Sequence, residues 1–143
     1  MSRSVNLDRL FAVARNAQSR AYAPYSRFRV GAAVATETDL YFAGCNVENA
    51  AYPATTCAEA SAVASMVVGG ATRIVAIMVV GDGEKLVTPC GNCRQIIREF
   101  GTPETAIHIA GPQGIRASFT LTELLPESFG PENLNVPEVA TCA

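Results

Sequence analysis

Three cysteines and one glutamate in this chain of 143 residues have the spacing of a reactive metal site. Glu59 follows Cys57 by two residues, and Cys90 and Cys93 form a C-x-x-C pair directly after Pro89. Three sulfur ligands would leave the fourth position of a tetrahedral zinc ion free for water, which is typical of a catalytic site. Zinc lowers the pKa of bound water, although three anionic sulfurs hold it higher than neutral imidazoles would. A nearby base is then needed, and Glu59 is the candidate to accept and pass on the proton.

Both cysteine groups are predicted to lie where a helix begins. We expect one helix over residues 56–68, closed by Gly69-Gly70. A second helix opens at Thr88-Pro89 and runs to residue 100, with Pro89 in the first helical position. A helix N-terminus carries about +0.5 of an elementary charge, which favours a thiolate over a thiol.

The rest of the chain indicates an α/β fold with helices on both faces of a sheet. Residues 74–80 are β-branched and almost continuously apolar, as in a strand buried on both faces. No repeat or linker divides the sequence, so we expect a single domain over residues 1–143. The other predicted elements are a helix over residues 7–21, strands over residues 28–35, 40–47, 106–110 and 115–119, and a short helix over residues 122–125.

Composition excludes several classes of protein. The chain is 49% hydrophobic and 17% charged, which fits a globular domain with a core and excludes disorder. A formal net charge of −2 and a single lysine argue against a nucleic-acid partner. The longest strongly apolar run, residues 74–80, is far shorter than the roughly 20 residues that cross a bilayer. Since the opening MSRSVNLDRL also lacks an apolar signal core, we expect a cytoplasmic protein without a membrane partner.

The remaining cysteines and the single histidine are assigned no part in the chemistry. Five cysteines are an odd number, so a disulfide scaffold explains them less well than thiolate or metal chemistry. Cys45 falls in a predicted strand and Cys142 near the end of the chain, and both are interpreted as small apolar residues. His108 lies in an apolar strand pattern and is interpreted as a core or surface histidine.

The candidate metal residues also have simpler explanations. The sequence from Thr56 to Glu59 fits a capping box, in which Glu59 would only close the start of a helix. Cys90 and Cys93 could form a redox pair or half of a structural zinc site. The combination of C-x-E with a later P-C-x-x-C favours a deaminase, because zinc deaminases carry a signature of this kind and include an all-cysteine form.

Five motifs follow one another along nearly the whole chain. They are YSRFRVGAA at residues 25–33, GCNVENA at 44–50, CAE at 57–59, PCGNCRQ at 89–95 and LLPESFGP at 124–131. Together they resemble the short, homotetrameric cytidine deaminases. The resemblance implies a three-layer α-β-α sandwich with a central mixed sheet, and hydrolysis of cytidine and deoxycytidine to uridine and deoxyuridine with release of ammonia. It also implies one Zn²⁺ per subunit held by Cys57, Cys90 and Cys93, with zinc-bound hydroxide as nucleophile and Glu59 as proton shuttle.

The same resemblance implies the substrate contacts. Asn46 and Glu48 would hold the ribose 3′-hydroxyl, and Phe28 would pack on the base. An Asn and a Glu two residues apart at a strand end point to the same side, although a solvated polar strand end is the alternative. Phe129 lies in the segment that reaches into a neighbouring subunit's pocket in tetrameric relatives, so we expect a homotetramer.

One position departs from the family pattern. Many members carry an arginine directly after the catalytic glutamate, where it offsets the negative charge of the sulfurs, and this chain has Ala60. Zinc with three thiolates carries a net negative charge, to which hydroxide adds. The two helix N-termini and Arg94 are the available compensation, and we expect Arg94, next to Cys93, to take the larger share.

Four alternatives to a cytidine deaminase stay open at this point. Blasticidin S deaminase shares the C-A-E and P-C-G-x-C-R-Q motifs but has no counterpart of Asn-Val-Glu-Asn-Ala, and modified cytosine nucleosides are further candidate substrates. A deaminase of polynucleotide bases would need a positively charged channel, which the net charge disfavours. From a different class, the chain could be a catalytically inactive zinc-stabilised interaction module, against which the presence of Glu59 argues.

Overall fold

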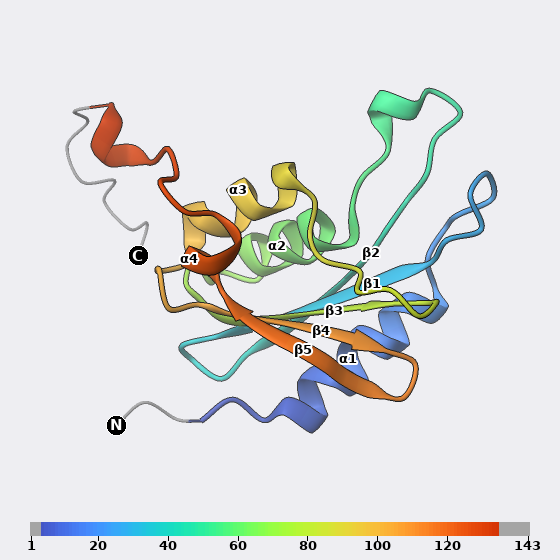
Figure 1. Ribbon diagram of the computed structural model, residues 1–143, viewed down its shortest axis with the longest axis horizontal. Helices are drawn as coiled ribbons and strands as arrows, with labels where there is room; N and C mark the ends of the chain where they lie inside the picture. Colours follow the sequence, from blue (N-terminus) through green and yellow to red (C-terminus); the bar gives the residue numbers. More distant parts are fainter. Residues whose placement is uncertain (1–3, 135–143) are drawn as a thin grey trace.

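The computed structural model describes residues 4–134 and contains one five-stranded mixed sheet (Figure 1). The strand order is β2-β1-β3-β4-β5, in which β3 and β4 are parallel and the other neighbouring pairs are antiparallel. The predicted buried strand, β3, lies in the middle of the sheet. The strands are β1 (Val30–Thr36), β2 (Tyr41–Cys45), β3 (Ile74–Gly81), β4 (Ala106–Gly111) and β5 (Gly114–Thr120).

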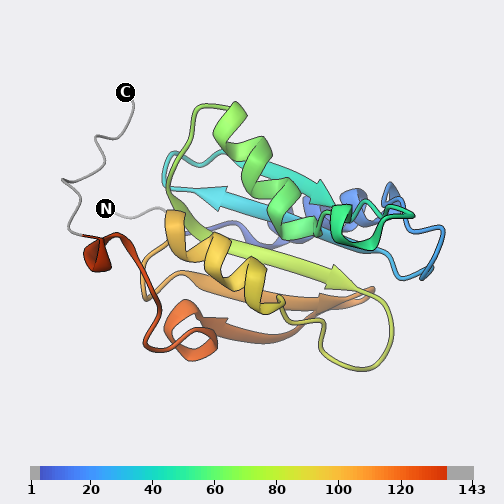
Figure 2. The same cartoon turned by 90° about the horizontal axis from the view of Figure 1, so that it is seen from above.

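Helices cover both faces of this sheet. In Figure 1, α1 lies below the strands and α2 and α3 lie above them. Figure 2 shows α2 and α3 side by side over the sheet. The predicted three-layer α-β-α sandwich with a mixed sheet is therefore confirmed. The helices are α1 (Leu7–Ser19), α2 (Ala58–Val68), α3 (Gly91–Phe100) and the short α4 (Leu121–Leu124), with 3-10 turns at Tyr52–Ala54 and Pro131–Asn133.

Two apolar cores lie on opposite faces of the sheet because side chains alternate along each strand. On β3, Ile77 and Val79 face α2 and α3, whereas Met78 and Val80 face α1. All four are fully buried, as predicted for a strand covered on both faces. The side chains of β1, which pairs with β2 in a hairpin, also alternate between the two cores. Most of those buried in the cores are alanines, so the helices on both faces can lie close to this part of the sheet.

Glycines allow the closest of these approaches. A Cβ at Gly44 on β2 would lie 2.2 Å from the backbone nitrogen of Ala62 in α2. A Cβ at Gly31 on β1 would lie 2.1 Å from the carbonyl oxygen of Ala14 in α1. The backbone of α2 therefore rests directly on β2, and this contact fixes the helix whose first turn carries Glu59.

Some predicted boundaries are wrong. Phe28 was expected within a strand, but β1 begins at Val30, because Arg27 adopts a left-handed conformation (φ 59°) that interrupts the extended chain. Pro89 was expected inside the third helix, but Cys90 is its N-cap, with an extended backbone and a carbonyl that accepts the first helical hydrogen bond, from Arg94. The first helix ends at Ser19, two residues before the predicted end.

Within the described part of the chain, none of the helices has the length and apolar character that a membrane crossing requires. Cys142 lies outside the described residues.

Candidate metal centre and substrate site

The first turns of α2 and α3 bring three sulfur atoms together. Cys57 is the N-cap of α2, Cys90 is the N-cap of α3, and Cys93 lies buried in the first turn of α3. Their Sγ atoms all lie within 4.8 Å of one another. Two sulfurs bound to one zinc at about 2.3 Å each are roughly 3.8 Å apart in a tetrahedral site, so a small contraction closes the cluster on the ion. The predicted convergence of the cysteines is therefore confirmed, and the donor set fits zinc.

Without a cation, burial and the neighbouring negative charges make it unfavourable for all three cysteines to ionise together. Burial raises the pKa of Cys57, and the neighbouring charges of Cys90 and Glu59 raise it further. Burial also raises the pKa of Cys93, together with the charges of Glu59 and the other two cysteines. Burial works in the same direction at Cys90, but hydrogen bonds from Cys93 and other neighbours outweigh it and lower that pKa. A divalent cation would let all three sulfurs ionise together.

Glu59 lies beside this cluster in an environment suited to proton transfer. Its side chain is buried, with 5% of its surface exposed. Burial raises the pKa of its carboxyl, against weaker lowering by its own backbone N–H and by Cys93. The capping-box interpretation is wrong, because the N-cap of α2 is Cys57 and Glu59 is the second helical residue instead of the third. Glu59 is therefore available as an acid and base next to the sulfurs.

Arg94 binds the backbone around the third helix. Its Nε donates to the carbonyl of Pro89 at 2.7 Å, and its Nη1 donates to the carbonyl of Leu124 at 2.8 Å. These bonds tie the segment before Cys90 to the end of α4. Its role in offsetting the charge of the sulfurs stays a prediction.

The amide of Asn46 holds the chain on both sides of residue 29. Its Oδ1 accepts from the backbone N–H of Val30 at 2.9 Å, and its Nδ2 donates to the carbonyl of Phe28 at 2.8 Å. The segment that follows β2 is therefore paired with the loop that precedes β1. This pairing explains why the ladder of β1 begins only at Val30.

The carboxylate of Glu48 holds the same loop further upstream. Its Oε1 accepts from the backbone N–H groups of Tyr25 at 2.9 Å and Ser26 at 3.1 Å, and its Oε2 accepts from the hydroxyl of Ser26 at 2.5 Å. The hydroxyl of Ser26, against a weaker opposing effect of burial, lowers the pKa of Glu48, and the two backbone N–H groups add to this effect. Glu48 is therefore ionised at neutral pH and holds the loop before β1, while its contact with substrate stays a prediction.

Phe28 borders a surface hollow formed by the loop after β3. The residue is 42% exposed and lines, with residues 82–88, a hollow of about 420 Å³. Residue 88 is followed by Pro89 and then by Cys90. The hollow thus lies where the loop after β3 enters the metal-binding turn of α3.

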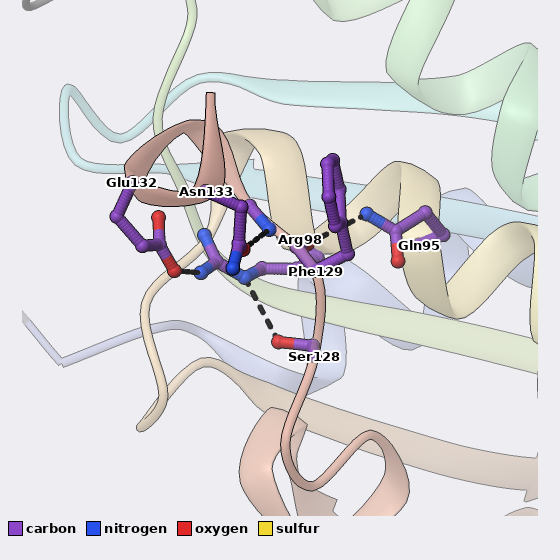
Figure 3. A network of polar contacts seen from close by, with 7 residues as sticks. Gln95, Arg98, Ser128, Phe129, Glu132 and Asn133 are labelled. Carbon is purple, nitrogen blue, oxygen red and sulfur yellow. Dashed lines mark hydrogen bonds and ion pairs between the residues drawn. The ribbon is translucent and has the colours of Figure 1, made fainter. Parts of the chain in front are cut away.

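The segment that carries Phe129 is fastened to α3 (Figure 3). Gln95 donates to the carbonyl of Phe129 at 3.0 Å, and Arg98 donates to the hydroxyl of Ser128 at 3.0 Å and pairs with Glu132. The Phe129 ring remains 57% exposed. This helix therefore binds the C-terminal segment through residues that stand two and five positions after Cys93.

Several of these residues were missed by sequence reasoning. Tyr25, Ser26 and Gln95 stand within the quoted motifs, but no role was assigned to them, because their bonds are to groups 22 to 34 residues away. Arg98 gave no signal, since an arginine at a helix end is common. Cys45 lies in β2 as expected and is not part of the sulfur cluster. His108 is half-buried in β4, where its Nδ1 and the hydroxyl of Ser118 are 2.7 Å apart.

Comparisons with known proteins agree with this site. The cytidine and deoxycytidylate deaminase zinc-binding region matches residues 4–109. The cytidine deaminase of Sporosarcina psychrophila is 39% identical over 131 residues, which cover 92% of this chain and 96% of that protein. The cytidine deaminase of Halalkalibacterium halodurans is 40% identical over 131 residues, covering 90% of this chain and 99% of that protein.

Solved structures give the same result for the fold. A crystal structure of cytidine deaminase from Burkholderia pseudomallei has a TM-score of 0.80 and 40% identity, covering 85% of this chain and 98% of that chain. A crystal structure of cytidine deaminase from Mycobacterium tuberculosis has a TM-score of 0.76 and 38% identity, covering 89% and 99% of the two chains. Because the matched family region contains all three clustered sulfurs and the buried Glu59, the chain belongs to the cytidine and deoxycytidylate deaminase family of zinc-binding proteins.

Proposed function

We propose that this protein hydrolyses cytidine and deoxycytidine to uridine and deoxyuridine, with release of ammonia and with one zinc ion per subunit. The observation that carries this proposal is the buried carboxyl of Glu59 beside three clustered sulfurs. A zinc ion held by Cys57, Cys90 and Cys93 supplies the positive charge that lowers the pKa of an attacking water.

Glu59 moves the protons of the reaction. It accepts a proton from water as the oxygen adds to C4 of the base, and it delivers a proton to N3. It then transfers the proton of the new C4 hydroxyl to the amino nitrogen, so that the C4–N bond breaks and ammonia leaves. Burial supports this double role, because it raises the pKa of the Glu59 carboxyl and so favours the protonated form that delivers a proton to the base.

The hydrogen-bonding capacity left on Asn46 and Glu48 suits one hydroxyl of the sugar. Glu48 Oε1 already accepts two backbone N–H groups, whereas Oε2 accepts one donor and keeps one lone pair. Asn46 Nδ2 uses one N–H on Phe28 and keeps the second. A ribose 3′-hydroxyl that donates to Glu48 and accepts from Asn46 would satisfy both groups. Phe28, exposed in the hollow, packs on the base.

A substrate panel with one matched variant tests the proposal. We expect the protein to remove the absorbance band of cytidine and deoxycytidine, with little conversion of CMP, cytosine or blasticidin S. Glu59→Gln keeps the shape of the side chain but cannot shuttle the proton, so kcat should fall about a hundredfold to ten-thousandfold with zinc content unchanged. Removing zinc with a chelator should abolish activity, and adding zinc back should restore it. Full-speed turnover by the metal-free protein, or faster conversion of CMP or blasticidin S than of cytidine, would overturn the proposal.

The inactive zinc-stabilised module is disfavoured by the position of Glu59. Burying a carboxyl beside anionic sulfurs is unfavourable for folding, and a purely structural site has no use for it. The panel separates the two alternatives, because an inactive module would bind zinc and convert no substrate.

We also propose that residues 1–143 form one catalytic domain that works in the cytoplasm as a homotetramer, without a nucleic-acid partner. Exposed aromatic side chains support assembly: Tyr52 is 76% exposed, and Tyr22 and Phe129 are each 57% exposed. Sedimentation should give a tetramer with full activity, and a fully active monomer would contradict this assignment.

A further inference from the structure

The loop before β1 is fastened to the segment after β2 by hydrogen bonds that meet at Ser26. Its hydroxyl lies 2.5 Å from Glu48 Oε2 and 3.0 Å from the backbone nitrogen of Phe28. An ionised carboxylate can only accept, so the Ser26 hydroxyl donates to Glu48. Its lone pairs then accept the N–H of Phe28. One small side chain thus links the proposed sugar contact to the proposed base contact.

The backbone between these two contacts is bent to make the link. Arg27 adopts a left-handed conformation, with φ of 59°. Residues other than glycine adopt this conformation rarely, and they keep it where surrounding bonds hold the chain. Here the bend returns the N–H of Phe28 to the hydroxyl of Ser26 only two residues earlier. The bend and the hydroxyl therefore act together on the position of the Phe28 ring.

The link is separate from the bonds that hold the loop in place. Glu48 Oε1 binds the backbone N–H groups of Tyr25 and Ser26, and Asn46 binds the backbone of Phe28. None of these bonds uses the Ser26 hydroxyl. That hydroxyl acts instead on Oε2, which is the carboxylate oxygen with a lone pair left for substrate.

We propose that Ser26 is a positioning residue that sets the orientation of the Glu48 carboxylate and its spacing from Phe28, and thereby selects nucleosides that carry a 3′-hydroxyl. This inference rests on the proposed function. It assigns to Ser26 no contact with the reacting atoms. Its effect should therefore fall on substrate binding and on the choice between sugars, and the rate of the chemical step should be unaffected.

Two variants of equal shape test the proposal. Ser26→Thr keeps a hydroxyl, and Ser26→Val replaces it by a methyl group of the same size. The measurements are kcat and KM for cytidine and for 3′-deoxycytidine, which lacks the hydroxyl that Glu48 and Asn46 would bind. Zinc content and thermal midpoint of both variants are measured beside the wild type, so that a loss of folding is recognised.

We expect Ser26→Val to raise KM for cytidine about tenfold, as for one misplaced hydrogen bond to a charged group, with kcat within about twofold of the wild type. KM for 3′-deoxycytidine should rise much less than KM for cytidine, because that substrate shares the Phe28 contact but makes no contact with the Glu48 carboxylate. Ser26→Thr should restore the preference for cytidine. Ser26→Ala, which lacks the bulk of valine, should repeat the result of Ser26→Val.

Other outcomes would overturn the inference. An equal loss with both substrates would mean that Ser26 only supports the loop, and a fall in kcat at constant KM would place its effect on the chemical step. Wild-type values for Ser26→Val would show that the hydroxyl has no role. If the wild-type protein converts neither nucleoside, the proposed function fails first, and this result is distinguishable from all of the others.

Discussion

The contact between Gly44 and α2 makes a prediction that links packing to the metal centre. In Gly44→Ala, the new Cβ would lie 2.2 Å from the backbone nitrogen of Ala62 and 2.4 Å from the carbonyl oxygen of Ala58, whereas ordinary contact begins at 3.4 Å. Both neighbours are main-chain atoms of α2, so no side chain can rotate away. The helix must move from β2 by about 1 Å, and Cys57 and Glu59 must move with it.

This displacement is large compared with the tolerance of a zinc site. Metal–sulfur distances vary by about 0.2 Å, and a misplacement of about 1 Å in an active site can cost a hundredfold in rate. We expect Gly44→Ala to lower the free energy of unfolding by about 3 kcal/mol, at the upper end for overpacking. Zinc content should fall, and kcat/KM for cytidine should decrease about a hundredfold.

Urea denaturation with and without a chelator, zinc analysis and the absorbance assay measure these effects. Ala43→Ser is the matched control, because Ala43 is the adjacent, exposed residue of β2 and its substitution should change stability by less than about 0.5 kcal/mol. If Gly44→Ala kept the denaturation midpoint, zinc content and activity of the wild type, the packing of α2 on β2 would not control the metal site.

Three further predictions concern the surroundings of the site. Arg94→Ala should lower both zinc affinity and turnover, and unchanged values in a zinc titration and the absorbance assay would exclude charge compensation by this residue. Arg98→Ala should release the segment of Phe129, because it removes the hydrogen bond to Ser128 and the ion pair with Glu132. Sedimentation should show weaker assembly, and an unchanged tetramer would argue against the role of this segment. The ratio of KM for cytidine to KM for 3′-deoxycytidine should stay constant down to about pH 5 and rise only below 4.5, the ordinary pKa of Glu48. The reason is that the ionised carboxylate is lost only as pH falls through its lowered pKa. A rise of this ratio at neutral pH would contradict the assignment of Glu48.

Strong periodic patterns predicted the frame of the molecule well. The apolar run at residues 74–80 corresponds to β3, and both cysteine groups lie at the start of a helix as predicted, although the N-caps at Cys57 and Cys90 come one or two residues after the predicted openings. These features depend on local spacing and on burial of whole faces, which the sequence records directly. The same spacing placed the sulfur ligands on two helix starts. It could not show that α2 and α3 lie side by side, so the shared zinc site was inferred from the ligand types and spacing and then from the resemblance to known deaminases.

The positions of the proposed substrate contacts depend on hydrogen bonds between residues that are far apart in the sequence. The hydrophobic sequence around Phe28 resembles a strand, but the bend at Arg27 and the side chain of Asn46 delay the start of β1 to Val30. Asn46 and Glu48 were expected to hold the ribose 3′-hydroxyl, and the structure shows that each holds a loop at least sixteen residues away in the chain. Such long-range hydrogen bonds leave no periodic signal, and they decide where the proposed substrate contacts stand.

The charge balance of the sulfur site is connected with the way its backbone is held. Residue 60 supplies no cation, so positive charge must come from the helix N-termini or from Arg94. The guanidinium of Arg94 is hydrogen-bonded to the carbonyl of Pro89, just before α3, and to the carbonyl of Leu124, at the end of α4. Arg94 therefore fixes the backbone in front of Cys90. We predict that it also offsets the negative charge of the sulfurs, because this chain lacks the arginine after Glu59.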